Sequence, residues 1–196
     1  MEYAAFGRAL QRRRSAFLHE LREARRVLVM GDGDGRALRA LLDAAPKAVV
    51  DYVDSSGKML EFARLRAGDA RVTYRRADAR EIDLPRGEYD AVVTHFFLDC
   101  LTQQETGELI ERVSFSVKPG AVWIVSEFQQ SAWWSALFVR GLYEFFRIAT
   151  GLQVRRIADY RSALLNGGFA QQKSQTVWGG LLVSEVWRFS ESPDAL

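Results

Sequence analysis

Short β-rich runs alternate with helical patterns through the first two thirds of the chain, and this alternation restricts the fold more than any other feature. The runs cover residues 27–30, 48–53, 71–76, 89–97 and 121–128. Helical patterns follow the first, second and fourth runs. Parallel neighbours in a sheet need crossover connections of this kind. The sequence therefore predicts five parallel strands covered by helices.

Two further β-rich runs near the C-terminus have no helical pattern between them. They cover residues 169–178 and 181–189, and only Gly179 and Gly180 separate them. A two-residue glycine loop joins antiparallel strands in a tight hairpin. We therefore expect an α/β fold with a doubly wound sheet, three layers (αβα) and an antiparallel C-terminal hairpin.

The length and composition suit a single domain. The chain has 196 residues, of which 48% are hydrophobic and 27% are charged, and this is enough for one well-filled core. We expect residues 1–196 to form one domain. The first 25 residues lack proline and carry an apolar stripe among arginines, which predicts an N-terminal helix over 1–25.

Charge and cysteine usage exclude several classes of protein. The formal net charge of +2 does not indicate the basic surface of a nucleic-acid-binding protein. Cys100 is the only cysteine, so no intrachain disulfide forms, and we expect a reducing, cytoplasmic location. The charged N-terminal segment lacks the apolar core of a secretory signal. No histidine, cysteine and carboxylate group has metal-ligand spacing, so we expect no metal site.

A glycine-rich loop, GDGDG, follows the first β-rich run. Its glycines are Gly31, Gly33 and Gly35. A dinucleotide-binding loop has its third glycine one position later, where this chain has Arg36. A carboxylate such as Asp32 or Asp34 beside a pyrophosphate costs on the order of 1 to 4 kcal/mol. The loop therefore favours a phosphate-free ligand with a positive centre, and S-adenosylmethionine has these properties.

The same two aspartates also suit a structural role. An aspartate at a helix N-cap satisfies backbone amides that have no partner within the helix. Helix capping by Asp32 or Asp34 is therefore an alternative interpretation, although it does not account for three glycines in five residues.

Aspartates follow the second and third β-rich runs as well. Asp54 comes 19 residues after Gly35, where a carboxylate can accept both hydroxyls of a ribose. Asp78 follows the third run, where an acceptor can bind the exocyclic amine of an adenine. Open α/β sheets bind ligands at the carboxyl ends of their strands. The pattern therefore predicts an adenosine site at that edge.

At these residues the chain resembles the class I S-adenosylmethionine-dependent methyltransferases. The resemblance covers residues 25–190 and rests on five segments in the family's order: VLVMGDGDG, VDSSGKML, ADAREIDLP, YDAVVTHFFLDCL and VKPGA. It implies a Rossmann-like, seven-stranded sheet with an antiparallel seventh strand, and methyl transfer from S-adenosylmethionine. One departure is Val29, which stands where the family commonly has an acidic residue. Our hypothesis is that Asp32 or Asp34 takes over that polar role.

The resemblance also implies a set of cofactor-binding residues at the ends of the first four strands. They are Gly31, Asp32, Gly33 and Gly35, then Asp54, Ser55 and Met59, then Asp78 and Ala79, and finally Thr94 and His95. The glycine loop would contact the methionine part of the cofactor and Asp54 the ribose. Asp78 and the Ala79 amide would contact the adenine, and the end of the fourth strand would lie nearest the sulfonium.

Methyl transfer is an in-line displacement at an activated carbon, so positioning and desolvation can supply most of the catalysis. A general base is needed only where the acceptor loses a proton. The candidates for this catalytic role are His95, whose ordinary pKa lies near neutrality, and Asp99.

The segment 131–150 is expected to form a helix on the acceptor side. Because it contains Arg140, Glu144 and Arg147, it lacks the roughly 20 uncharged residues of a transmembrane span. Its apolar arc is wider than one packing face needs. One interpretation is a helix buried in the domain or in a homodimer interface. The other is a lid that lines a pocket for a small lipophilic acceptor or contacts a membrane surface, as the resemblance to methyltransferases of quinones and lipid head groups implies.

Other functions remain as alternatives. A nicotinamide-dependent oxidoreductase is disfavoured by Arg36 and by the charge of the glycine loop. A non-catalytic binding module with the same fold stays open. A nucleic-acid or protein methyltransferase also stays open, although the sequence after the fourth strand is THFF rather than the N/D-P-P-Y/F tetrapeptide of many nucleic-acid enzymes.

Overall fold

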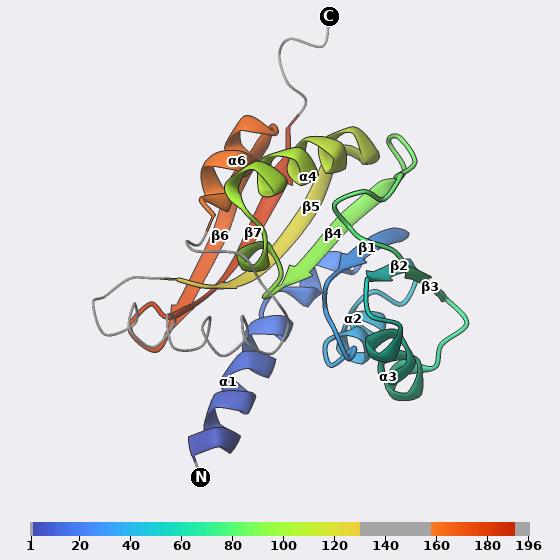
Figure 1. Cartoon of the computed structure of the whole chain (residues 1–196), viewed down its shortest axis with the longest axis vertical. Coiled ribbons are helices and arrows are strands. Elements are labelled where there is room, and N and C mark those ends of the chain that lie inside the picture. Colours follow the sequence, from blue (N-terminus) through green and yellow to red (C-terminus); the bar gives the residue numbers. More distant parts are fainter. Residues whose placement is uncertain (1, 130–157, 191–196) are drawn as a thin grey trace, which may run out of the picture.

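One seven-stranded sheet forms the centre of the molecule. The computed structural model describes residues 2–129 and 158–190 (Figure 1). The strands are β1 (Arg26–Met30), β2 (Val49–Asp54), β3 (Val72–Arg76), β4 (Tyr89–His95), β5 (Val117–Phe128), β6 (Phe169–Val177) and β7 (Leu182–Phe189). Their order in the sheet is β3-β2-β1-β4-β5-β7-β6.

Strand direction follows the expectation from the sequence. Strands β1 to β5 pair in parallel, and β7 runs antiparallel to both β5 and β6. The C-terminal hairpin therefore adds to the sheet with β7 inside and β6 at the edge. The doubly wound sheet and its antiparallel hairpin are confirmed.

Helices cover both faces of the sheet. They are α1 (Glu2–Ser15), α2 (Leu38–Ala44), α3 (Gly57–Ala67), α4 (Gln103–Ser116) and α6 (Tyr160–Asn166), with short 3-10 helices η1 (Leu18–Leu21) and η2 (Leu98–Cys100). On one face, η1, α2 and α3 pack against alternate residues of the central strands, such as Val29 and Val93. On the other face, α4 and α6 pack around Trp123. These are the expected three layers.

Local sequence signals account for several helix boundaries. The Thr102 side chain and Glu105 form a reciprocal capping box at the start of α4. Ser56 caps α3 by accepting a hydrogen bond from the Met59 amide. Ser56 closely follows the end of β2, whereas Thr102 follows η2, which lies between β4 and α4.

Three expected boundaries were wrong. The N-terminal helix ends at Ser15, and η1 then packs separately against the sheet. The fifth strand, expected over 121–128, begins at Val117, so the segment 118–120 belongs to β5; the register against β4 shifts there and Gly120 has a φ of 78°. The hairpin loop has four residues, 178–181, because Trp178 also adopts a positive φ (53°) before the two glycines.

The segment 131–150 lies outside the described residues, and so does the lid or interface expected there. Among the described helices, none is long and apolar enough to cross a membrane.

Candidate active site

The predicted site residues follow strands that lie next to one another. Met30, the last residue of β1, pairs with Val53 of β2 and with Thr94 of β4. The Gly31 amide donates a hydrogen bond to the Val53 carbonyl at 3.0 Å, which ties the glycine loop to the end of β2. The carboxyl ends of these strands face the C-terminal end of α1 (Figure 1).

The glycine loop is packed tightly at both ends and open in its middle. A Cβ atom at Gly31 would lie 2.2 Å from the Phe97 ring, and one at Gly35 would lie 2.8 Å from the Ala63 backbone. Both glycines have positive φ, so a side chain is excluded by the backbone as well as by the neighbours. A Cβ at Gly33 would meet nothing within 4 Å. The loop therefore leaves open space above its central glycine.

Asp32 is a buried carboxyl on the α2–α3 face of the sheet. It is 4% exposed, and its Oδ2 accepts a hydrogen bond from the Tyr52 hydroxyl at 3.3 Å. The Arg14 Nε atom of α1 lies 3.7 Å from Oδ1, which has no hydrogen-bond partner in residues 2–129 and 158–190. Burial raises the pKa of Asp32 to about 7, although Arg14, Tyr52 and the Ala37 amide oppose this shift. The backbone of Asp32 belongs to the glycine loop, while its side chain links that loop to α1.

Asp34 has a different role from Asp32. Its carboxylate pairs with Arg36 at 3.0 Å and with Arg66 of α3 at 2.9 Å. The N-cap of α2 is Ala37, which makes no side-chain cap bond. Neither aspartate is the N-cap residue of α2, because a further turn separates the loop from the first residue of the helix, but the Asp32 carboxyl does accept a hydrogen bond from the Ala37 amide.

Asp54 lies between the glycine loop and the start of α3. Its Oδ1 accepts a hydrogen bond from the Ser56 amide at 2.8 Å, and the Gly33 amide also stabilises the charged form. Burial nevertheless raises its pKa. Within residues 2–129 and 158–190, no lysine or arginine forms an ion pair with Asp54. Ser55 is exposed and Met59 is half-buried at the same edge.

Arg80 holds the carboxylate of Asp78. Its guanidinium bonds Asp78 Oδ2 at 2.6 Å and Glu105 of α4 at 2.6 Å. These contacts lower the pKa of Asp78. The buried Ala79 presents its carbonyl to Arg112 of α4 at 3.3 Å. An adenine amine at Asp78 would therefore share this carboxylate with Arg80, a neighbour that the sequence analysis did not consider.

Thr94 and His95 point to opposite faces of the sheet. Thr94 Oγ1 accepts a hydrogen bond from the Trp123 indole at 3.0 Å, within the core under α4 and α6. His95 lies on the α2–α3 face and is 1% exposed, and within the described parts of the chain neither ring nitrogen has a hydrogen-bond partner. Burial and the nearby Arg14 lower the pKa of His95 to about 3. The imidazole is therefore neutral at physiological pH.

Asp99 lies in η2, directly after the loop that leaves β4. It is buried, and Cys100 Sγ lies 3.5 Å from its Oδ1. The carboxyl of Glu127, at the end of β5, is also close enough that Asp99 raises its pKa. Glu127 was missed by the sequence analysis. Its only sequence signal is an acidic residue at the end of an otherwise apolar strand, AVWIVSEF.

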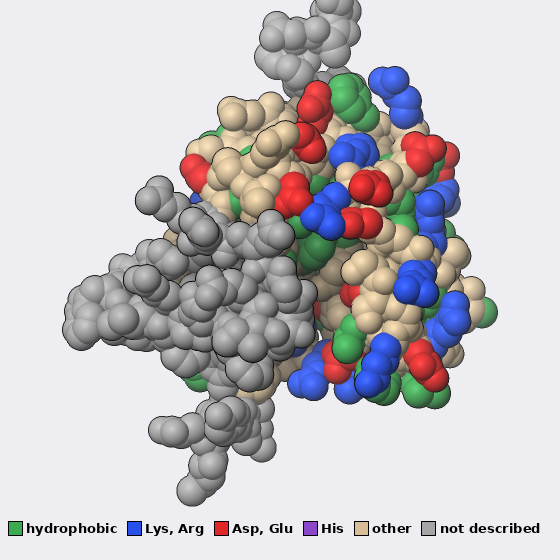
Figure 2. Space-filling view, viewed as in Figure 1, with side chains coloured by type: hydrophobic (Ala, Val, Ile, Leu, Met, Phe, Trp, Pro, Cys, Tyr) green, Lys and Arg blue, Asp and Glu red, His purple; other side chains and the backbone are tan. Residues whose placement is uncertain are grey.

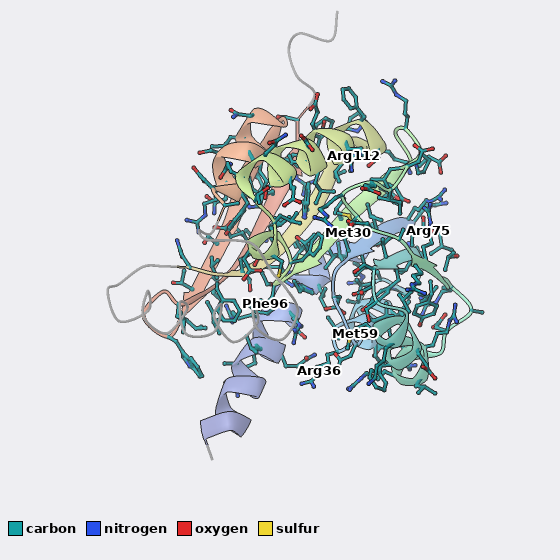
Figure 3. The ribbon with its side chains drawn as sticks, in the orientation of Figure 1. Met30, Arg36, Met59, Arg75, Phe96 and Arg112 are labelled. Carbon is teal, nitrogen blue, oxygen red and sulfur yellow. The ribbon has the colours of Figure 1, made fainter. Side chains whose placement is uncertain are left out.

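Side chains from several helices and strands lie at the edge of the sheet that forms the candidate site. Met59 of α3 and Phe96, which follows β4, lie at the same edge of the sheet, with Arg36 from the glycine-loop region below them (Figure 3). Farther out, the face over α3, β3 and α4 carries basic and acidic side chains interspersed (Figure 2). The structure thus brings the ends of β1, β2 and β4 together as expected.

Comparison with known proteins gives a consistent match. Residues 27–120 match a family model described as a methyltransferase domain. The chain is 33% identical over 114 residues to polyamine aminopropyltransferase 2 of Bacillus anthracis, covering 50% of this chain and 32% of that protein. It is 35% identical over 104 residues to demethylmenaquinone methyltransferase of Clavibacter sepedonicus, covering 53% of this chain and 41% of that protein. The chain thus spans less than half the length of these relatives.

A solved structure resembles the fold over most of its length. It is the Burkholderia thailandensis 1,6-didemethyltoxoflavin-N1-methyltransferase with bound 1,6-didemethyltoxoflavin and S-adenosylhomocysteine. The TM-score is 0.69 at 20% identity, and the match covers 93% of this chain and 79% of that one. At this identity the likeness establishes the fold alone, and it agrees with the Rossmann-like sheet described above.

Proposed function

We propose that the chain is a class I S-adenosylmethionine-dependent methyltransferase, which transfers a methyl group from this cofactor to a small, lipophilic acceptor. The observation that carries the cofactor assignment is the open glycine loop beside the carboxyl of Asp54. The apolar segment 131–150 and the name of the menaquinone relative support the lipophilic acceptor. We place the reaction in the cytoplasm and in one domain.

The described residues fit the chemistry of this cofactor. The open space at Gly33 admits a ligand against the loop backbone. Asp54 keeps a carboxylate free of cationic partners among the described side chains, as hydroxyl donors on a ribose require. The carboxyl of Asp32 is buried against Tyr52 and Arg14, so only the backbone of this residue is available to the ligand. We assign the ribose to Asp54, the methionine part to the loop around Gly33, and the adenine to the Asp78–Ala79 loop.

When bound, S-adenosylmethionine supplies a methyl group already activated by a sulfonium. The chain then has to hold the acceptor in line and exclude water. Burial of the β4 end and of η2 provides a dry environment at this point. Positioning rather than strong acid–base chemistry is therefore the main contribution of the protein.

Where the acceptor loses a proton, we assign the proton to Asp99 rather than to His95. A histidine with a pKa of about 3 is a weak base at neutral pH, and His95 lies beneath α1 near Arg14. Asp99 lies on the loop between β4 and α4, at the edge where open α/β sheets bind ligands. An O–H or N–H of the acceptor would pass its proton to the Asp99 carboxylate as the methyl group transfers.

The cofactor assignment is tested by titration calorimetry with S-adenosylhomocysteine and, separately, with NADH. We expect micromolar affinity for the first and no binding of the second. Asp54→Ala should weaken S-adenosylhomocysteine binding at least tenfold, which corresponds to about 1.4 kcal/mol. Asp83→Ala, at an exposed aspartate, is the matched control. Unchanged affinity in Asp54→Ala would overturn the ribose assignment.

The acceptor class needs a separate measurement. Incubating the full chain with labelled S-adenosylmethionine and panels of quinols, phenols, amines, nucleic acid and protein should label a lipophilic small molecule. Labelling of nucleic acid or protein alone would overturn the acceptor proposal while leaving methyl transfer intact. Cofactor binding without labelling of any panel member would favour the non-catalytic module.

A further inference from the structure

Glu127 is a buried acid without a counterion. It is 0% exposed at the carboxyl end of β5, and no lysine or arginine in the described part of the chain forms an ion pair with it. Apart from the side chain of Asp99, a second acid, its Oε2 has no hydrogen-bond partner among the described residues. Burying a carboxyl in this way is costly, so a structure that keeps one gains something specific from it.

One oxygen of Glu127 fixes the loop that leaves β4. Oε1 accepts hydrogen bonds from the Phe97 amide at 3.0 Å and from the Leu98 amide at 2.8 Å. The preceding residue, Phe96, has a φ of 54°, so the chain turns sharply here and its next amides have no strand partner. Glu127 therefore supplies, from β5, the acceptor that this turn requires.

The loop fixed by Glu127 contacts both halves of the proposed site. The Phe97 ring packs directly on Gly31, the first residue of the cofactor loop. Two residues after Phe97 comes Asp99, the proposed proton acceptor, whose charge acts on the Glu127 carboxyl. A displacement of this loop would thus move the wall of the cofactor loop and the acceptor-side carboxylate together.

Several titratable groups surround the Glu127 carboxyl. Asp99 and Cys100 face it from η2, and Tyr160 faces it from α6. None of the three is cationic. Two carboxyls in such a site share one proton, since like charges a few Å apart in a dry environment do not both ionise. Burial and Asp99 accordingly raise the pKa of Glu127 well above its ordinary value.

We propose that Glu127 is a positioning residue for the methyl transfer assigned above: its Oε1 locks the 96–99 loop against Gly31, and its protonated carboxyl leaves the negative charge on Asp99. The proposal rests on the proposed function for its consequence. It concerns how the 96–99 loop keeps the glycine loop and Asp99 in fixed positions relative to each other. The glycine loop and the aspartates at the strand ends do not account for this.

The decisive comparison is between Glu127→Gln and Glu127→Ala in the full chain. Glutamine keeps an oxygen for the Phe97 and Leu98 amides and is permanently neutral, so S-adenosylhomocysteine affinity should stay within about threefold of wild type. Alanine removes the acceptor and frees the loop, so the affinity should fall at least tenfold. The probe is S-adenosylhomocysteine in titration calorimetry.

Glu185→Gln is the matched control. Glu185 is another fully buried carboxyl on the same face, one strand away, but its partners are Tyr160, Arg161, Gln171 and Trp187 rather than the 96–99 loop. Its replacement should lower the free energy of unfolding and leave S-adenosylhomocysteine affinity unchanged. A fall in affinity equal to that of Glu127→Ala would mean that any disturbance of this face has the same effect, and would overturn the proposal.

Infrared difference spectroscopy tests the protonation state independently. In an Asp32→Asn background, which removes the other carboxyl whose pKa lies near 7, the chain and its Glu185→Gln variant should show at neutral pH a protonated-carboxyl band that the Glu127→Gln variant lacks. Equal affinities for glutamine and alanine variants, or an unchanged band in Glu127→Gln, would overturn the positioning role. Failure of wild type to bind S-adenosylhomocysteine would instead overturn the proposed function, so the two failures are distinguishable.

Discussion

At the scale of single residues, the two aspartates of the glycine loop have different surroundings although they are only two positions apart. Asp34 is held at the surface by Arg36 and Arg66, whereas Asp32 is buried between Tyr52 and Arg14. The difference follows from which face of the loop each side chain leaves. Of these two aspartates, Asp32 alone therefore has a charged form that is strongly destabilised by burial.

The pH dependence of stability should report this cost. The pKa of Asp32 is about 7 when folded and 3.8 in its unperturbed state. Between these values the folded chain binds more protons at Asp32 than the unfolded chain does, so the free energy of unfolding falls as pH rises through this window. Relative to Asp32→Asn, the wild type should lose up to about 4 kcal/mol across it. Urea unfolding at several pH values measures this, with Asp34→Asn as control, and parallel curves for wild type and Asp32→Asn would contradict it.

His95 should show the opposite dependence. Its pKa is about 3 when folded and 6.5 in its unperturbed state, so the unfolded chain binds the extra proton. The contribution of His95 to stability is full above the unfolded value and is lost as pH falls towards about 3. In the NMR spectrum of the folded chain, the ring signals of His95 should stay constant from about pH 8 to pH 5. A titration near neutrality would contradict its neutral, buried state and reopen its role as a base.

At the scale of elements, the order and direction of the strands could be read from the sequence, because parallel pairing follows from alternation of β-rich runs with helices. The expected strand boundaries were wrong where local turn-forming residues indicated a loop but the segment pairs with a neighbouring strand. The fifth strand was expected to begin at residue 121, after Pro119 and Gly120, yet Val117 pairs with Tyr89 of β4 and the segment 118–120 belongs to β5. Pairing with a neighbouring strand is a tertiary effect that a local pattern does not contain.

Helix α1 docks on the sheet through its last turn. The Arg13 carbonyl accepts hydrogen bonds from Ser126 of β5 at 3.1 Å and from Ser184 of β7 at 3.0 Å. Replacing both serines by alanine removes these two hydrogen bonds and leaves the carbonyl only the Ala16 amide, at a cost of about 0.5 to 1.5 kcal/mol per bond. We expect faster amide hydrogen exchange across α1, measured by mass spectrometry. Ser174→Ala, on the exposed strand β6, should leave exchange in α1 unchanged, and equal exchange in the double variant would contradict the docking role.

At the scale of the whole molecule, the sequence predicts which edge of the sheet should bind a ligand. It does not predict which side chains from distant parts of the sequence come into contact at that edge. Asp54 and Asp78 are predicted as site residues because residues that follow parallel strands gather at one edge of the sheet. Arg14, Arg80 and Glu127 are not, because each acts through a contact made only after folding. Arg14 of α1 contacts Asp32, and Glu127 of β5 accepts hydrogen bonds from the Phe97 and Leu98 amides, which follow the neighbouring strand β4.

A ligand that binds this edge joins β1, β2 and β4 through their loops, so it should stabilise the whole fold. At 100 times its dissociation constant, a ligand that binds only the folded state adds about 2.7 kcal/mol. For a chain of 196 residues this raises the Tm by roughly 5 to 10 °C. S-adenosylhomocysteine should produce this shift in differential scanning calorimetry, and NADH at the same concentration should not.

The same measurement separates the site from non-specific stabilisation. In Asp54→Ala the shift at that ligand concentration should fall by about half or more, since a tenfold weaker dissociation constant removes about 1.4 kcal/mol of the linkage energy. Asp83→Ala should keep the full shift. An equal shift in both variants would show that the ligand stabilises the fold without contacting the end of β2, and the adenosine site would then have to lie elsewhere.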